Sequence, residues 1–247
     1  MDRELRSLTL KHVEVDEVWT FVGKKQARLT LDERAERSDL GDVYLWTALD
    51  AETKLVASHL VGKRSADNAR RLMMDLASRL QWPTAGQSDD RNYNRPGFQK
   101  ITQISTDGFT AYPEAVDLAF GPYVKFGTIV KDYRNASLPY TPSEMVGTKR
   151  KGIFGIPDDE VRSICTSHTE RHNLTVRTLL KRFTRLSLGF SKKLANLQAA
   201  VSIFMAYYNW VWRTRDAING RYRLPAAMLA GVTDRLWTFE DLFNAVQ

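Results

Sequence analysis

Cysteine is almost absent from this chain of 247 residues: its only thiol is Cys165, which excludes an internal disulfide. Such use of cysteine fits a reducing compartment. No apolar run approaches the roughly 18 residues that a membrane-spanning helix requires. Residues 1–6 (MDRELR) are too charged to begin a secretory signal. The sequence therefore predicts a soluble cytoplasmic protein.

Acidic residues are also in deficit, with 29 Asp and Glu against 36 Lys and Arg, which gives a net charge of +7. A positive excess favours a polyanionic partner, and nucleic acid is the commonest. A basic protein without a specific partner is the other reading of the same charge. The length suffices for one sizeable α/β domain with a full core.

Alternating and helical patterns of apolar residues predict an α/β protein with a mixed five-stranded sheet flanked by helices. The first three strands form an antiparallel meander, and Ser65 is the expected N-cap of the first helix. Three strands, a helix, a strand, a helix and a strand is the element order of the ribonuclease-H-like fold. The expected strands are 12–22, 43–49, 55–60, a strand ending at Asp107, and 123–130; the expected helices are 65–80, 112–120, 167–185 and 194–208.

Three stretches interrupt this order. The charged connector 31–41 and the polar loop 82–100 have no predicted structure of their own, and such long loops often contact a partner. The third is an insertion over 131–157, which contains the basic cluster Lys149-Arg150-Lys151 and precedes the helix over 167–185.

Two candidate site residues, Asp16 and Asp107, belong to predicted strands. Asp16 lies in the middle of the first strand, where β-propensity and burial both disfavour an aspartate. Glu14 and Glu17 compete with it, and alternation alone does not decide which of these acids faces a site. Asp107 ends the fourth strand, and active sites of open α/β sheets form beyond the carboxyl ends of strands. A plain turn at Asp107-Gly108 is the alternative.

A third acid, Glu170, belongs to the helix predicted over 167–185. At about 100° per residue, this helix gathers apolar side chains on one face and polar ones on the other. A carboxylate followed by cations on one face can hold Mg²⁺ while the cations bind flanking phosphates. The alternative is a solvated acid that the helix dipole favours. The apolar face is Val176, Leu179, Leu180 and Phe183; the polar face is Glu170, Asn173, Arg177 and Lys181.

Around these acids the sequence resembles a known family. The segments VDEVWTFVG (15–23), STDG (105–108) and TERHNLTVR (169–177) are similar to the three acidic motifs of DDE transposases from small bacterial insertion sequences. The group in question is typified by the first-described insertion sequence. Further similarity covers KRFTR (181–185), GFSKK (189–193) and PAAMLAGVT (225–233), so the resemblance extends over most of the chain from about residue 11.

The resemblance implies that Asp16, Asp107 and Glu170 are the catalytic residues and hold two divalent cations, Mg²⁺ with Mn²⁺ as a substitute. It implies hydrolysis that frees a 3′-hydroxyl at a transposon end and strand transfer of that hydroxyl into target DNA. The partners are DNA and further copies of the chain, in a bacterial, nucleoid-associated setting. The expected DNA-binding residues are Asn173, Arg177, Lys181, Arg182, Lys192 and Lys193.

The resemblance also divides the chain into an N-terminal lead (1–10), a ribonuclease-H-like DDE catalytic domain (11–213) and a helical C-terminal extension (214–247). Relatives usually carry a DNA-end-recognition domain before the first catalytic strand, and none is visible here. Three readings stay open: a partial transposase, a downstream reading frame that is joined to an upstream-frame DNA-binding protein or domain, and a protein that takes its specificity from a partner. The alternatives are a ribonuclease-H-like nuclease that does not transpose and an inactive DNA-binding transposase remnant.

Overall fold

Strand β1 (His12–Val22) lies in the middle of a six-stranded mixed sheet with the order β3-β2-β1-β4-β5-β6. The structure, a computed structural model, describes residues 4–83, 101–134, 144–184, 187–216 and 219–245. Strands β1, β2 and β3 form an antiparallel meander; β4 lies parallel to β1, β5 parallel to β4, and β6 antiparallel to β5. The remaining strands are β2 (Gly41–Asp50), β3 (Val56–Gly62), β4 (Thr102–Thr106), β5 (Val124–Arg134) and β6 (Glu144–Phe154).

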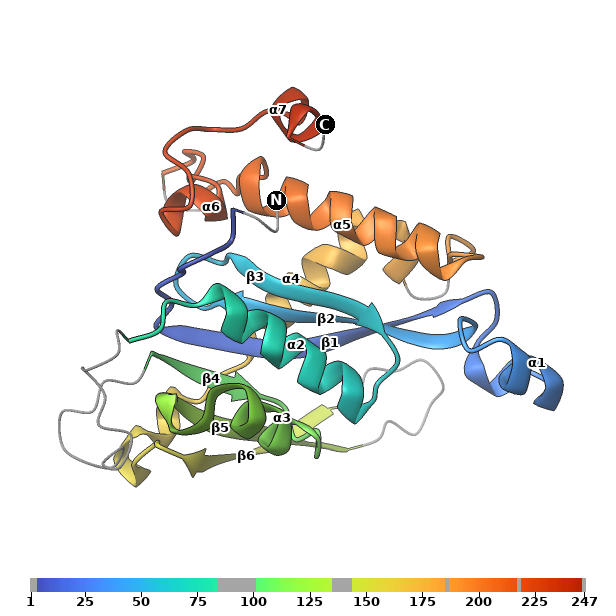
Figure 1. Cartoon of the computed structure of the whole chain (residues 1–247), viewed down its shortest axis with the longest axis horizontal. Coiled ribbons are helices and arrows are strands. Elements are labelled where there is room, and N and C mark those ends of the chain that lie inside the picture. The colour runs from blue at the N-terminus through green and yellow to red at the C-terminus, as the bar shows by residue number, and fades with distance from the viewer. Residues whose placement is uncertain (1–3, 84–100, 135–143, 185–186, 217–218, 246–247) are drawn as a thin grey trace.

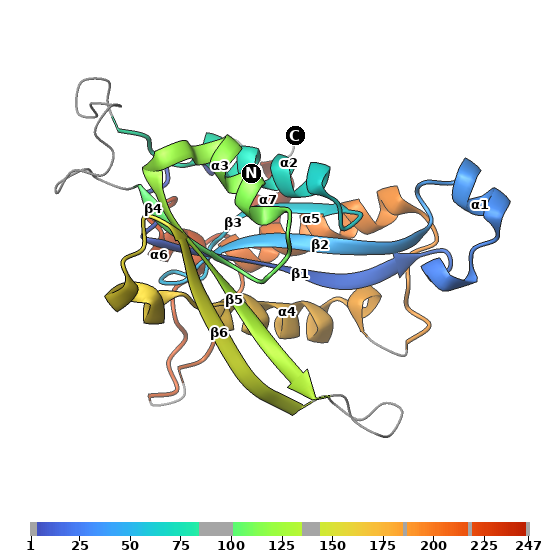
Figure 2. The same ribbon diagram turned by 90° about the horizontal axis from the view of Figure 1, so that it is seen from below.

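Helices cover both faces of this sheet (Figures 1 and 2). Figure 2 shows α2 and α3 on one side of the strands and α4 on the other. The α/β architecture with this strand order is consistent with a ribonuclease-H-like topology. The α-helices are α1 (Leu31–Glu36), α2 (Ala66–Arg79), α3 (Tyr112–Phe120), α4 (Ser167–Leu179), α5 (Leu194–Trp210), α6 (Ala226–Leu229) and α7 (Phe239–Asn244).

Alternation along β1 divides the hydrophobic interior between the two faces. Val13 and Val15 belong to a cluster with the buried residues of α2 and α3. Val18 and Val22 belong to a second cluster with residues of α4 and α5. Each fully buried side chain of this size contributes about 1.5–3 kcal/mol of hydrophobic free energy. The sheet is thus fixed from both sides, and its strand ends are rigid supports for polar side chains.

Several predicted elements are confirmed. Helix α2 begins after Ser65, whose hydroxyl accepts a hydrogen bond from the backbone N–H of Asn68 at 3.3 Å, as an N-cap should. Helix α3 has the predicted bounds, and β4 ends directly before Asp107. Helix α5 packs its apolar side chains into the core as expected, with Leu197 and Val201 fully buried.

The prediction of five strands is wrong, because the insertion predicted over 131–157 contributes β6 and extends β5. Glycines at 147 and 152 and the cluster Lys149-Arg150-Lys151 hide the strand pattern. The same lysines suit an edge strand, because charge on an edge opposes pairing with another chain. Most of the predicted loop 82–100 lies outside the described residues.

Two predictions about helices also need correction. The connector 31–41 contains α1, which begins with a capping box between Thr30 and Glu33. The helix predicted over 167–185 ends at Leu179 and is followed by a separate 3₁₀ turn, η5 (Lys181–Phe183). As a result Leu179 is half exposed instead of packed, whereas Val176, Leu180 and Phe183 are buried as expected.

Residues near the two ends of the described chain share one core cluster with the sheet. Leu5, Leu8 and Leu10 are buried in it, and so are Ala227 and Leu242. Leu8 forms a parallel bridge with Leu80 at the end of α2. None of the helices within the described ranges is long and apolar enough to cross a bilayer.

Candidate functional site

Asp16 and Asp107 meet because of the register between β1 and β4. The last parallel pair is Val15 with Thr106, so the next residue of each chain segment is an aspartate. Beyond this point β4 no longer covers the edge of β1, and a cleft of about 650 Å³ opens there. We call it the acidic cleft; its polar lining residues are Asp16, Glu17, Arg64, Asp107, Thr110, Lys131, Thr166, Glu170, Asn173 and Arg177.

Asp16 is held in place by two donors. Its Oδ1 accepts a hydrogen bond from the backbone N–H of Glu17, and its Oδ2 accepts one from Asn173 Nδ2, both at 2.8 Å. Burial raises the pKa of Asp16 to about 6, and the charge of Asp107 raises it further against the effect of the Glu17 N–H. Asp16 is therefore an oriented carboxylate that a nearby positive charge would stabilise.

Glu17 is a third carboxylate of this group, although the sequence pattern left its role open. Its side chain is only 3% exposed, with Oε1 3.5 Å from Arg64 Nε. Burial raises the pKa of Glu17 to about 8, and Asp107 adds to the effect. Carboxylate oxygens of Asp16, Glu17 and Asp107 lie within 4.8 Å of one another. Glu17 reaches the cleft from the opposite face of β1 because the strand edge is uncovered there.

Asp107 is oriented by its own turn and by Arg64. Its Oδ1 accepts a hydrogen bond from the backbone N–H of Phe109 at 2.9 Å, and its Oδ2 accepts one from Arg64 Nη2 at 3.0 Å. The guanidinium of Arg64 also lies 4.3 Å from the centroid of the Phe109 ring. Arg64 thus bridges Asp107 and Glu17 and compensates part of their negative charge.

Glu170 enters the cleft from the first turn of α4. Its Oε1 accepts a hydrogen bond from Thr166 Oγ1 at 2.8 Å, and Lys131 of β5 forms an ion pair with it. The positive end of the helix dipole favours a carboxylate in this first turn. Glu170 lines the same cleft as the aspartates but lies outside the 4.8 Å cluster.

The predicted DNA-binding residues separate into three sets. Asn173 and Arg177 follow Glu170 along α4 and line the cleft, although Asn173 is buried and its amide is engaged with Asp16. Arg182 lines a different pocket. The other predicted DNA-binding residues, Lys181, Lys192 and Lys193, are exposed and line neither of these two pockets.

Glu14, the other competitor of Asp16, has a structural position. It is fully buried, and its Oε2 accepts hydrogen bonds from the backbone N–H groups of His168 at 2.8 Å and Thr169 at 3.0 Å. Its Oε1 lies 2.7 Å from His168 Nδ1. These are N–H groups that a helix start leaves without an intrahelical partner, so Glu14 caps α4 from the sheet.

Two functional candidates, Arg64 and Lys131, escaped the sequence pattern, and a third, Glu17, was named only as a competitor of Asp16. Glu17 carried a signal, because a glutamate in an otherwise apolar strand is costly to bury. Arg64 lies just after β3 and Lys131 lies within β5, so only the pairing of distant strands brings them to the cleft. No local spacing could have identified them.

The donor set of the cleft fits a divalent cation of the Mg²⁺ type. Hard cations prefer oxygen ligands, and Asp16, Glu17 and Asp107 present carboxylate oxygens within 4.8 Å of one another. Burial together with mutual repulsion raises the pKa values of Asp16 and Glu17. A dication among them would reverse that effect, because it favours the ionised carboxylates.

No model of a known protein family matches the chain, and a search of curated proteins gives no significant match.

Proposed function

We propose that the chain is the catalytic part of a DDE-type DNA transposase, which cleaves transposon ends and transfers the freed strand into target DNA. The observation that carries the proposal is the meeting of Asp16, Asp107 and Glu170 in one cleft, although they come from separate elements. The resemblance of the motifs around these acids names the same residues. The strand order and the net charge of +7 agree with this function.

In this proposal Asp16, Asp107 and Glu170 would hold two divalent cations, Mg²⁺ or Mn²⁺, and Glu17 lies close enough to take part. When bound, such ions activate the attacking oxygen and stabilise the leaving oxygen of an in-line phosphoryl transfer. Asn173 keeps Asp16 in the orientation that faces the cleft. Arg177 lies on the same helix as Glu170 and would bind a phosphate beside the reacting one.

Arg64 and Lys131 compensate the acids when no other cation does. Arg64 pairs with Asp107 and Glu17, and Lys131 pairs with Glu170. Both cations sit at the rim of a cleft that must accept a polyanionic strand. Once dications neutralise the carboxylates, these two side chains can turn toward phosphate oxygens instead.

The test is a comparison of the wild-type chain with Asp107→Ala in Mg²⁺, with DNA carrying a free 3′-hydroxyl end and a supercoiled plasmid as target. We expect the wild type to cleave DNA and to join the 3′-hydroxyl end to the plasmid, and Asp107→Ala to do neither. Cleavage without joining would identify a nuclease that does not transpose. Equal activity of the two proteins, or no activity in either, would contradict the proposed transposase function.

A further inference from the structure

A second pocket lies beyond the acidic cleft along β1, with a volume of about 310 Å³. Its walls are the end of β1, residues between Gly23 and Arg28, and residues of the two described stretches after α4, 182–184 and 187–190. We call it the aromatic pocket. Its aromatic and cationic lining residues are Trp19, Phe21, Phe183, Phe190, Lys24, Lys25, Arg28 and Arg182.

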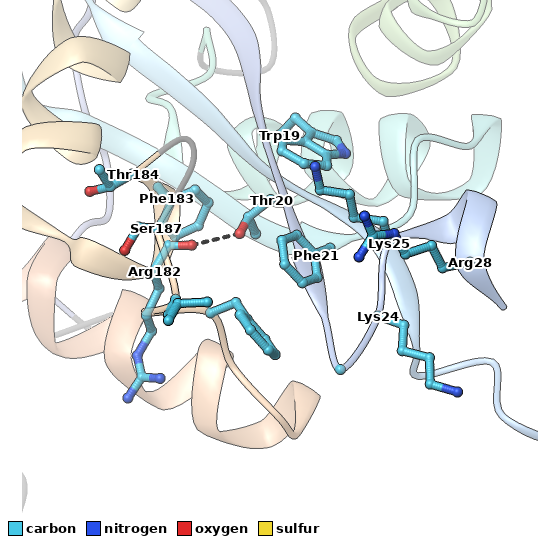
Figure 3. A pocket seen from close by; sticks show the side chains of 13 residues that line it. Trp19, Thr20, Phe21, Lys24, Lys25, Arg28, Arg182, Phe183, Thr184 and Ser187 are labelled. Atoms are coloured by element: carbon cyan, nitrogen blue, oxygen red, sulfur yellow. Dashed lines mark hydrogen bonds between the residues drawn. The ribbon is translucent and has the colours of Figure 1, made fainter.

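Three rings of this pocket, those of Trp19, Phe21 and Phe190, are partly buried and contact one another in a chain. Figure 3 shows Trp19 and Phe21 beside the cationic side chains of the pocket. The centroid of Phe21 lies 5.9 Å from that of Trp19 and 4.7 Å from that of Phe190. Lys25 Nζ lies 5.7 Å from the centroid of the Trp19 ring. Rings that belong to a core are normally covered, as Trp46 and Phe126 are here. Trp19, Phe21 and Phe190 instead keep part of their surface open to the pocket.

Charge distinguishes the aromatic pocket from the acidic cleft. Among the described residues that line it, four are cationic and none is acidic, whereas Asp16, Glu17, Asp107 and Glu170 all line the cleft. Aromatic faces accept stacked bases of any sequence, and neighbouring cations bind the phosphates between them. This combination is what an unpaired segment of a nucleic acid strand requires.

The two pockets are connected through shared elements. Asp16 of the cleft and Trp19 of the aromatic pocket both belong to β1. Arg177 of the cleft lies in the last turn of α4, and Arg182 of the aromatic pocket follows just after the end of that helix. The hydroxyl of Thr20 donates a hydrogen bond to the carbonyl of Arg182 at 2.6 Å, which joins the walls of the aromatic pocket. At about 3.3 Å per strand residue, Trp19 and Phe21 lie about 10–16 Å beyond Asp16. At the spacing of about 3.4 Å in stacked duplex DNA that distance equals about three to five nucleotides, and it equals fewer in an extended unpaired strand.

We propose that the aromatic pocket binds an unpaired base of the DNA strand whose reacting phosphate lies in the acidic cleft. The base stacks on Trp19 and Phe21, and Lys25, Arg28 and Arg182 bind the phosphates on either side. The inference rests on the proposed function for the position of the strand, but base binding itself can be measured without catalysis.

The experiment uses single-stranded oligonucleotides that contain 2-aminopurine, whose fluorescence falls when the base stacks, with the full chain in EDTA. We expect wild-type protein to quench the probe, and Trp19→Ala and Phe21→Ala to weaken binding roughly tenfold and to lose most of the quenching. Trp19→Phe keeps a stacking ring and should restore most of the effect. Lys25→Glu changes an exposed side chain without touching the core, so it tests the pocket even where Trp19→Ala does not fold.

The matched control is Phe243→Ala, which removes an exposed ring from α7, a helix that contributes no residue to the aromatic pocket. It should quench and bind like the wild type. Equal quenching by wild type, Trp19→Ala and Lys25→Glu would overturn the proposal, and so would equal quenching of a fully paired probe. Loss of quenching in the control variant would overturn it as well.

The two proposals fail separately. If the wild type quenches the probe through Trp19 but neither cleaves nor joins DNA in Mg²⁺, the proposed function is wrong and the base-binding pocket stands. If cleavage depends on Asp107 while Trp19→Ala and Lys25→Glu bind the probe normally, the pocket proposal is wrong and the proposed function stands.

Discussion

Glu14 and Asp16 lie two residues apart on β1, and both carboxylates point toward α4. Glu14 is fully buried and accepts hydrogen bonds from two backbone N–H groups in the first turn of α4. Asp16 lies one turn farther along the helix, where its partner is the side chain of Asn173 and the cleft is open. A carboxylate at a helix N-terminus gains from hydrogen bonds and from the dipole. In Asp16, burial raises the pKa of the carboxyl group and the charge of Asp107 adds to the effect, so a nearby cation would stabilise its ionised form.

The difference teaches that position along one strand decides between a structural and a chemical role. Parallel pairing with β4 covers β1 up to Val15 and stops there. Glu14 lies within the covered part and Asp16 just outside it. The end of a neighbouring strand therefore separates an acid that fastens a helix to the sheet from an acid that faces an open cleft.

The largest expected effect is a loss of DNA cleavage on substitution of Asp16, which a substitution of Glu14 should not cause. Asp16→Asn should lower the rate of Mg²⁺-dependent DNA cleavage at least about a hundredfold, because a metal-holding carboxylate loses its charge. Its folding free energy should change by less than about 1 kcal/mol, because the amide oxygen still accepts one of the two hydrogen bonds. Cleavage rates and urea denaturation measure the two quantities. Wild-type cleavage by Asp16→Asn would break the comparison.

Glu14→Gln should have the opposite profile. The variant keeps the shape of the side chain but loses the charge that binds the start of α4, so the free energy of unfolding should fall by about 1–3 kcal/mol. Glu52→Gln is the matched control, because Glu52 is exposed and forms a surface ion pair with Lys11. Urea denaturation compares the three proteins. Stability of Glu14→Gln equal to that of the control would show that Glu14 does not fasten α4.

The pH dependence of the free energy of unfolding should identify the carboxyl groups of the cleft whose pKa is raised by burial. In EDTA, a carboxyl group whose folded pKa lies above its unfolded value binds more protons in the folded state, so its stabilisation is lost as pH rises. Glu17, with a folded pKa of about 8, should therefore make the protein less stable at pH 8 than at pH 5.

The measurement is the difference in stability between wild type and Glu17→Gln, because the titration of groups distant from Glu17 cancels in it. We expect the variant to gain stability relative to the wild type as pH rises from about 5 to about 8, and added Mg²⁺ to reduce the gain. A difference that stays constant over this range would mean that Glu17 is not buried among charges.

A smaller effect is expected at Asn173, which orients Asp16. Asn173→Ala removes the donor to Asp16 Oδ2 and should lower the cleavage rate about tenfold, as loss of a ligand-orienting partner typically does. Loss of a donor to the ionised carboxylate also raises the pKa of Asp16, so the rate profile should shift to higher pH. Thr178→Ala, on the exposed side of α4, is the control and should leave both unchanged. An unshifted profile in Asn173→Ala would exclude the orienting role.

Much of the fold was predictable because its elements carry local signals. Alternation predicted β1 and its neighbours, and Ser65 with its helical apolar pattern predicted α2. The signal for β6 is weak because glycines and lysines replace the apolar residues of an ordinary strand. Helix α4 ends early, at Leu179, because the backbone of Leu180 is extended at φ −106° and ψ 94°. No glycine or proline in the sequence marks the end of this helix. Leu180 and Phe183, which follow it, are packed into the core.

The site was predictable in part for the same reason. Asp107 follows a strand and Glu170 opens a helix, so each had a local justification. The choice among Glu14, Asp16 and Glu17 depended on where β4 stops covering β1, which is a property of strand register. Arg64 and Lys131 come from other strands, and only the folded chain brings them to the acids.

Titration of the purified chain with Mn²⁺, followed by electron paramagnetic resonance, tests most directly whether the acidic cleft is a cation site. The wild type and Glu14→Gln should bind Mn²⁺ alike, and Mg²⁺ should displace it. Asp16→Asn and Asp107→Asn should each weaken binding at least about tenfold. Equal binding by all four proteins, or binding lost only in Glu14→Gln, would contradict a cation site built from the acids of the cleft.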